Sequence, residues 1–390
     1  MSREPDRRTV LKGVGTVGIG GILAGCTQTG GDGGDDGDGG ATTTEGTTQT
    51  TQRCADSIDV DVGMVYATGG LGDQSFNDSA HRGVQRTECQ LGISYQNSQP
   101  ETVSEFSTLQ RNFATESNPD YDLVCCIGFL QNEALTENAD NYPDQQFMTV
   151  DFVPMRDTDG DDEGDEQFDN VASYTFKEHE GSFQVGHLAG LLTTEELSAG
   201  GGETDPNETK VGFVGGVEAP LIERFEAGYR AGVQYANENV DVSSSYAGDF
   251  SAPDVGKETA LSMYDEGVDV IYHAAGGTGA GVFQAAREEE RYAIGVDSDQ
   301  SVSTEFGDVI VASMVKRVDN AVFTSIENVV EDNFQGGNNV ALGLERGGVE
   351  AVMGSQLGSA IPQDALDALD ESRQRIVAGE ISVPTDPDDV

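Results

Sequence analysis

The chain is poor in basic residues: among 390 residues it has 21 lysines and arginines but 70 aspartates and glutamates. The formal net charge of −49 argues against nucleic acid as a partner, because few cations are available to contact phosphates. An anionic membrane surface is disfavoured for the same reason. Apolar strand-like segments nevertheless persist throughout, so we expect folded domains with an acidic surface. Such a surface suits molar salt and predicts a halophile's protein.

Signatures of catalysis and of nucleotide-phosphate binding are also missing. There is no Walker A sequence and no Gly-x-Ser-x-Gly elbow, and the glycine clusters after the expected strands do not follow the GxGxxG pattern. The four histidines, His81, His179, His187 and His273, show neither metal-ligand spacing nor a neighbouring nucleophile motif. We therefore expect no enzymatic activity, no cofactor and no bound metal.

Residues 1–26 are typical of an export signal. Paired arginines at positions 7 and 8 precede a glycine-rich apolar run over 13–25, which is too short to span a bilayer as a stable helix. The arginines resemble a twin-arginine signal, and the sequence Leu-Ala-Gly-Cys ending at Cys26 resembles a lipobox. We expect lipidation of Cys26 to anchor the protein at the outer face of the cell membrane. An ordinary signal peptide with an incidental cysteine is the alternative.

Four cysteines remain after the signal. Residues 27–53 have almost no apolar side chain, so a flexible tether is predicted over 27–56. Cys54 precedes the first expected strand and Cys89 ends the helix that returns beside it, which makes a disulfide between them plausible in an exported protein. Cys125 and Cys126 are neighbours in an apolar strand and are expected to point to opposite faces as core residues.

The length suggests two or three domains, and strand-like and helix-like segments alternate. This alternation predicts an α/β protein with two doubly wound parallel sheets joined by a hinge. We expect lobe 1 over 57–175 with part of the C-terminal region, lobe 2 over 176–315, and a crossover with a C-terminal segment over 316–390. The expected strands fall at 58–66, 91–96, 121–127, 146–151, 170–175, 210–214, 242–247, 268–273, 292–296 and 308–314.

An acidic stretch over 157–167, DTDGDDEGDEQ, superficially resembles a calcium-binding loop. Asp162 stands where the turn glycine of such a loop belongs, and the closing glutamate is missing. We interpret the stretch as a solvated acidic insertion.

In doubly wound sheets, ligands bind outside the carboxyl ends of the strands. The residues near those ends that could contact a ligand are Asp73, Phe76, Asn77, Phe129, Phe225, Gly277, Asp297 and Lys316. Aromatic rings offer flat faces there, and carboxylates and amides offer directional hydrogen bonds. Lys316 is one of only five lysines and directly follows an apolar strand, so we expect it to face Asp297 across a cleft.

Structural roles remain open for several of these residues. Asp73 or Ser75 could cap the following helix, with Ser75-x-x-Asp78 as a capping box. Phe129 and Phe225 could equally be core residues.

Residues 72–80, GDQSFNDSA, resemble the GDkSFNDsa signature of the basic membrane protein family. These proteins are substrate-binding lipoproteins of ABC transporters, typified by a purine nucleoside receptor. Further similar segments, in family order, lie at 212–216, 275–279, 295–300 and 313–316, and the resemblance extends over essentially all of 58–345.

The resemblance implies a type I periplasmic-binding-protein fold that closes on a nucleoside between its lobes. Phe76 and Phe225 would stack on the base, Asn77 and Asp73 would hydrogen-bond its edge, and Asp297 and Lys316 would hold the ribose, with Gly277 giving backbone contacts. The segment with Phe129 departs from the family pattern, which leaves the base preference open.

The implied partners are a nucleoside and the permease and ATPase subunits of an ABC importer. Alternatives are a receptor for a sugar or a furan-type signal on the same fold, or a nucleoside-hydrolysing enzyme.

Overall fold

The computed structural model describes residues 54–161 and 164–390. The predicted signal, the lipidation site Cys26 and the predicted tether up to residue 53 lie outside the described residues. Within the described ranges, every helix is too short or too polar to cross a membrane.

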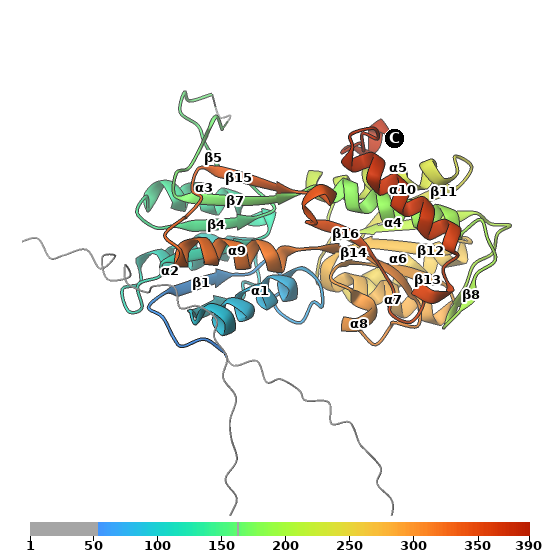
Figure 1. Ribbon diagram of the computed structural model, residues 1–390, viewed down its shortest axis with the longest axis horizontal. Helices are drawn as coiled ribbons and strands as arrows, with labels where there is room; N and C mark the ends of the chain where they lie inside the picture. Colours follow the sequence, from blue (N-terminus) through green and yellow to red (C-terminus); the bar gives the residue numbers. More distant parts are fainter. Residues whose placement is uncertain (1–53, 162–163) are drawn as a thin grey trace, which may run out of the picture. The chain divides into compact units, whose positions relative to one another are not determined.

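The first sheet has six parallel strands, as the alternating pattern predicts (Figure 1). Central strand β3 is buried on both faces, so its sequence Leu-Val-Cys-Cys-Ile is a continuous apolar run. The strand order is β15-β7-β4-β3-β1-β2. The bounds are β1 Asp61–Val65, β2 Ser94–Ser98, β3 Leu123–Ile127, β4 Phe147–Val150, β7 Val171–Phe176 and β15 Asn338–Leu342.

Two pairs of helices cover this sheet, and we call the sheet with its helices lobe 1. Helices α1 and α9 pack together and contribute buried residues to the core on one face, and α2 and α3 do so on the other. In Figure 1 the orange α9 lies beside the blue α1 although the two are far apart in sequence. Their bounds are α1 Phe76–Leu91, α2 Phe106–Thr115, α3 Asn132–Asn141 and α9 Val318–Val330.

The second sheet has the order β11-β10-β12-β13-β14-β16 and is parallel except for β16. The antiparallel edge strand β16 differs from the prediction, which was a parallel sheet. The reason is that β16 begins beside the end of β14, where Val349 pairs with Lys316, and therefore runs back along it. The bounds are β10 Lys210–Gly215, β11 Asp241–Tyr246, β12 Val270–Ala274, β13 Tyr292–Asp297, β14 Ile310–Lys316 and β16 Val349–Met353.

Helices also cover both faces of the second sheet, and together they form lobe 2. Helices α4, α5 and α10 contribute to one face, and α6 and α7 to the other. Their bounds, with that of the short helix after β13, are α4 Glu178–Leu192, α5 Pro220–Ala236, α6 Pro253–Asp265, α7 Gly279–Glu288, α8 Gln300–Ser303 and α10 Gln363–Val377. Small hairpins join β5 Met155–Arg156 to β6 Glu166–Gln167 and β8 Ser198–Ala199 to β9 Gly202–Glu203.

Within the described residues the chain passes between the lobes three times: from β7 to α4, from β14 to α9, and from β15 to β16. The lobe boundaries predicted at 175/176 and 315/316 fall beside the first two passages. All three passages leave from the carboxyl ends of strands, which is the edge where a ligand site is expected.

The close packing of α4 on α5 depends on glycines. A Cβ atom on Gly186 would lie 2.1 Å from the Tyr229 carbonyl oxygen, and one on Gly232 would lie 2.1 Å from that of Phe183. Because α4 begins at Glu178 and α5 carries Phe225, this packing fixes the separation of two side chains that matter for the site described below.

Cys54 and Cys89 are joined by a disulfide, which ties the segment before β1 to the end of α1. Cys125 and Cys126 are free and fully buried on opposite faces of β3. Burial raises the pKa of both thiols, so they are packing residues and not reactive thiolates.

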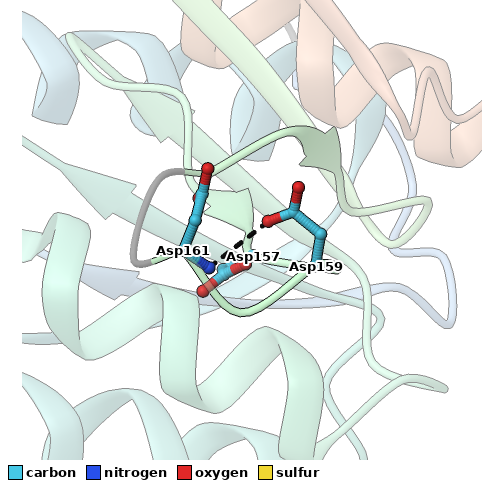
Figure 2. A group of neighbouring side chains, drawn as sticks. All are labelled: Asp157, Asp159 and Asp161. Carbon is cyan, nitrogen blue, oxygen red and sulfur yellow. Dashed lines mark hydrogen bonds between the residues drawn. The ribbon is translucent and has the colours of Figure 1, made fainter.

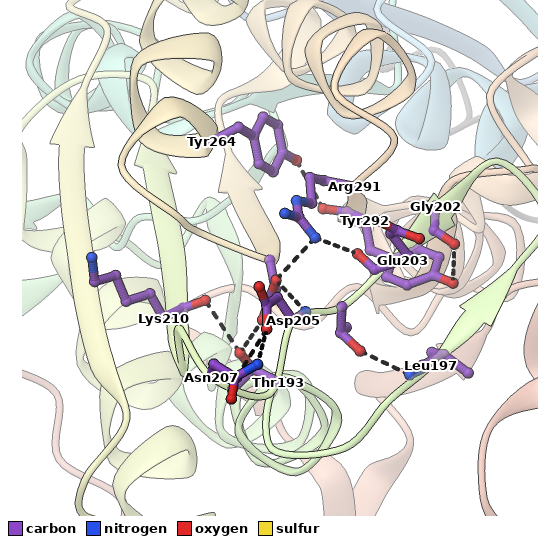
Figure 3. Close-up of polar contacts among 12 residues, drawn as sticks. Thr193, Leu197, Gly202, Glu203, Asp205, Asn207, Lys210, Tyr264, Arg291 and Tyr292 are labelled. Atoms are coloured by element: carbon purple, nitrogen blue, oxygen red, sulfur yellow. Dashed lines mark hydrogen bonds and ion pairs between the residues drawn. The ribbon is translucent and has the colours of Figure 1, made fainter.

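A buried polar network lies at the amino-terminal edge of the second sheet (Figure 3). The fully buried Asp269 carboxylate accepts from the Thr193 hydroxyl at 2.5 Å and the Asp205 backbone N–H at 2.9 Å, and it pairs with Arg291 at 3.4 Å. These partners come from the end of α4 and from neighbouring loops. The network therefore stabilises lobe 2 at the edge opposite the carboxyl ends of the strands.

Candidate functional site

One cleft at the carboxyl ends of the strands is lined by all eight residues that the sequence nominated. It has about 680 Å³ of space between its atoms, counting the part open to solvent. Both lobes contribute to its walls. Lobe 1 supplies Asp73, Phe76, Asn77, Phe129 and Asp151, and lobe 2 supplies Phe225, Phe250, Gly277, Asp297 and Lys316.

Three phenylalanines surround the ammonium group of Lys316. Its Nζ atom lies 5.2 Å from the ring centroid of Phe76, 5.0 Å from that of Phe176 and 5.5 Å from that of Phe225. Distances of this size are typical of cation–π contacts. Phe76 begins α1 and Phe176 ends β7, whereas Phe225 lies on α5, so Lys316 contacts rings from both lobes.

Lys316 is paired with two carboxylates. Its Nζ lies 2.6 Å from Asp151 Oδ1 and 3.0 Å from Glu178 Oε1, and the three side chains are 1 %, 4 % and 0 % exposed, respectively. The expected pairing of Lys316 with Asp297 is not among the ion pairs of the described residues. Asp151 and Glu178 take that place because the ends of β4 and β7 bring them to the ammonium group.

Burial and charge act together on this cluster. Burial alone would lower the pKa of Lys316, but the carboxylates of Asp151, Glu178 and Asp297 raise it above its ordinary value, so the lysine stays charged. Burial raises the pKa of Asp151 and raises that of Glu178 to about 7, although Lys316 favours the ionised form of both.

Asp297 ends β13 and presents a carboxylate to the cleft. Its Oδ2 atom accepts a hydrogen bond of 2.5 Å from the Ser75 hydroxyl. Burial raises the pKa of Asp297 to about 6, against the opposing effects of Lys316 and of the Ser75 hydrogen bond. Asp297 and Asp151 both have left-handed backbones, with φ of 64° and 76°. Strained backbones of this kind cluster at ligand sites.

Asp73 is a helix cap, as one interpretation of the sequence allowed. Its Oδ1 accepts from the backbone N–H groups of Ser75 and Asp78, and its Oδ2 accepts from that of Asn77. The capping box suggested by Ser75-x-x-Asp78 is not formed, because the Ser75 hydroxyl donates to Asp297 instead.

Asn77 is engaged with the backbone at the end of the first strand. Its Oδ1 accepts from the Ala67 N–H at 2.9 Å, and its Nδ2 donates to the Ala67 carbonyl at 3.5 Å. These contacts fix the side chain at the cleft wall and leave one N–H of the amide for another partner.

Phe129 meets Phe250 from the other lobe, edge to face, with ring centroids 6.4 Å apart. The backbone of Phe250 is held by Thr278, whose N–H donates to the Phe250 carbonyl. Gly277 lies beside this carbonyl, and a Cβ at that position would be 3.4 Å from the oxygen. This pair of rings forms part of the cleft wall where the two lobes meet.

Sequence reasoning missed three residues of the site. Asp151 follows β4 and satisfies the same strand-end rule, but it was counted as the last residue of the strand. Phe250 follows β11 within a polar loop, and Glu178 opens the helix after β7. The strand-end rule could have identified all three. Their roles could not be read locally, because Glu178 contacts a lysine 138 positions away in sequence.

None of the histidines lines the cleft. Burial lowers the pKa of His179, His187 and His273 to about 4, so these three are neutral packing residues at ordinary pH. His273 lies with its Nε2 3.0 Å from Gln300 Oε1.

The acidic stretch after β5 brings Asp157, Asp159 and Asp161 together, with one carboxylate oxygen of each within 4.8 Å of the others (Figure 2). All three side chains are exposed, and backbone N–H groups of the loop already donate to Asp157 and Asp159. We retain the interpretation of a solvated acidic loop.

Comparison with known proteins identifies the family. Residues 60–387 match the Bmp family model, described as ABC transporter substrate-binding protein PnrA-like. The CD4+ T-cell-stimulating antigen of Listeria monocytogenes is 38% identical over 350 residues, covering 85% of this chain and 90% of the relative. The ABC transporter nucleoside-binding protein BmpA of Lactococcus lactis is 29% identical over 346 residues, covering 84% and 90%.

A solved structure agrees with these matches. A solute-binding protein of an ABC transporter system from Aeropyrum pernix superposes with a TM-score of 0.71 at 31% identity, covering 84% of this chain and 95% of that one. The resemblance noted in residues 72–80 is thereby confirmed. The chain belongs to the Bmp family of PnrA-like ABC transporter substrate-binding proteins.

Proposed function

We propose that this protein binds a neutral nucleoside in the cleft between its lobes and delivers it to the permease of an ABC importer. The observation that carries the proposal is the combination, within one cleft, of an aromatic side chain from each lobe and an acidic strand end. Phe76 and Phe225 offer flat faces for a base, and Asp297 offers an acceptor for sugar hydroxyls.

The charges of the cleft favour a neutral ligand over an anionic one. Asp73, Asp151 and Asp297 line it, and the one cationic side chain among its lining residues, Lys316, already contacts two carboxylates. A phosphate group would therefore meet an excess of acidic groups without a free cation to pair with. The cleft is therefore expected to bind nucleosides more tightly than their monophosphates.

Transport also requires a location outside the cell. The twin-arginine signal and the lipidation of Cys26 remain proposals from the sequence, together with the tether and an acidic surface suited to high salt. They would place the cleft outside the membrane, within reach of the permease.

Replacing Phe225 by alanine tests the stacking role. We expect nucleoside affinity to fall by about 1–3 kcal/mol, or roughly 5- to 150-fold in Kd, the size of a lost base–aromatic stack. Isothermal titration calorimetry measures the change. Phe334→Ala is the matched control, since Phe334 packs on the core outside the cleft. Equal affinities of Phe225→Ala and the unsubstituted protein would return Phe225 to a packing role.

A further inference from the structure

Four hydrogen bonds join α1 and the loop before it in lobe 1 to the end of β13 and the residues that follow it in lobe 2. The shortest runs from the fully buried Ser75 hydroxyl to Asp297 Oδ2, at 2.5 Å. Gln300 Nε2 donates to the Gln74 carbonyl at 3.2 Å, and Ser298 Oγ donates to the Ser75 carbonyl at 3.5 Å. Arg82 on α1 adds a bond of 2.8 Å to the Ser298 hydroxyl.

The lobe 2 side of this contact is held firmly. Gln300 is 2 % exposed, and its Oε1 accepts from the Val296 backbone N–H at 2.8 Å. Its own backbone N–H donates to the Ser313 hydroxyl on the neighbouring strand. The amide is therefore locked in one orientation, with its N–H directed at lobe 1.

The two carboxylate oxygens of Asp297 consequently have different surroundings. Its Oδ2 is occupied by Ser75 from the opposite lobe, while the hydrogen bonds of the described residues include none to Oδ1. A carboxylate can accept bonds at both oxygens at once. The Ser75 bond exists only when the lobes are together, whereas Oδ1 remains available to a ligand in the cleft.

We propose that Ser75 is a positioning residue for ligand capture: its hydroxyl links the ligand-facing carboxylate of Asp297 to lobe closure. The inference rests on the proposed function for its ligand but concerns a residue that the binding roles above do not include. Ligand on Oδ1 and Ser75 on Oδ2 both favour the ionised, oriented carboxylate, so each stabilises the state that the other requires.

The test measures lobe separation directly. Spin labels are placed at Val103→Cys, which follows β2 in lobe 1, and at Val255→Cys, which follows β11 in lobe 2. Both positions are exposed, and the labels are placed in the full chain carrying Cys26→Ser. The native cysteines of the described residues are bridged or buried and do not interfere. Pulsed electron–electron double resonance then gives the distribution of distances between the two labels in the absence of ligand.

Ser75→Ala is expected to shift this distribution to longer distances and to raise the Kd for nucleosides by about tenfold, mainly through faster dissociation. The pH below which affinity falls should also move upward, because the lost hydrogen bond favoured the ionised Asp297. Ser182→Ala is the control: Ser182 is equally buried but bonds Tyr272 within lobe 2, and its removal should change none of the three readouts.

Gln300→Glu provides a second variant, which keeps the acceptor for Val296 but removes the amide N–H donated to Gln74. It should open the lobes in the same direction. An unchanged distance distribution in both variants would overturn the inference. If the unsubstituted protein binds no nucleoside while Ser75→Ala still opens the lobes, the linkage stands and the nucleoside assignment fails.

Discussion

Replacing Lys316 by methionine is expected to lower the free energy of unfolding by about 3–5 kcal/mol, because it leaves Asp151 and Glu178 buried without their shared cation. The same change should weaken the binding of nucleosides and of free bases by similar factors. The reason is that Lys316 contacts Phe76 and Phe225, so that its loss disturbs both stacking faces. Urea unfolding in molar KCl measures the first effect, and calorimetric titration measures the second.

The triple variant Lys316→Met, Asp151→Asn, Glu178→Gln is the control for this prediction. It removes all three charges together, and its stability should lie closer to that of the unsubstituted protein, since no unpaired buried charge remains. Asparagine is chosen at 151 because it tolerates the left-handed backbone there. If Lys316→Met weakened the binding of nucleosides but not that of free bases, the lysine would be a sugar contact, as the family resemblance implies.

Asp297→Asn should weaken nucleoside binding by about 1.5–3 kcal/mol, roughly 10- to 150-fold in Kd, and leave the binding of free bases nearly unchanged. The substitution removes the charge that accepts sugar hydroxyls but keeps the size of the side chain. Asparagine also tolerates the φ of 64° at this position, where alanine would add strain. Titration with a nucleoside and its free base compares the two effects, and equal weakening of both would remove Asp297 from the sugar site.

The pH dependence of binding follows from the same residue. Sugar hydroxyls donate to the ionised carboxylate, and burial raises the pKa of Asp297 to about 6. The contribution of Asp297 to nucleoside affinity should therefore be lost as the pH drops through about 6. Glu178 also titrates nearby, with a pKa raised to about 7. The Asp297→Asn variant separates the two, because the fall near pH 6 should be absent from its profile.

The sequence brought its candidate residues to one cleft because one geometric rule governs their positions. Parallel strands of a sheet end at the same edge, so residues that follow separate strands, such as Phe76 and Lys316, meet there. Each of the ten predicted strands also overlaps a strand of the structure, although the one predicted at 91–96 begins at the end of α1 and shares only its last three residues with β2. Strands β15 and β16 were missed because they are edge strands with mostly exposed or half-buried residues, which weakens the apolar signal.

The sequence around each residue did not predict which side chains of the cleft bond to one another. Ser75 fits a capping box with Asp78 by spacing, yet its hydroxyl donates to a carboxylate 222 positions away. Lys316 was expected to face Asp297 across a cleft, and both residues line the cleft, but the ion pairs of Lys316 are with Asp151 and Glu178. The Ser75–Asp297 and Lys316–Asp151 pairs depend on how the two lobes approach, and the Lys316–Glu178 pair depends on how α4 packs beside β14; the order of residues along one strand encodes neither.

The central claim is that the two lobes together recognise both halves of a neutral nucleoside. Calorimetric titration of the full chain carrying Cys26→Ser, in molar KCl, with adenosine, guanosine, inosine, uridine, ribose and adenine tests it most directly. The account predicts one-to-one binding of at least one nucleoside, far weaker heats with ribose or adenine alone, and recovery of the nucleoside intact by chromatography. Absence of heat with every nucleoside, on a sample shown to be folded, would contradict it.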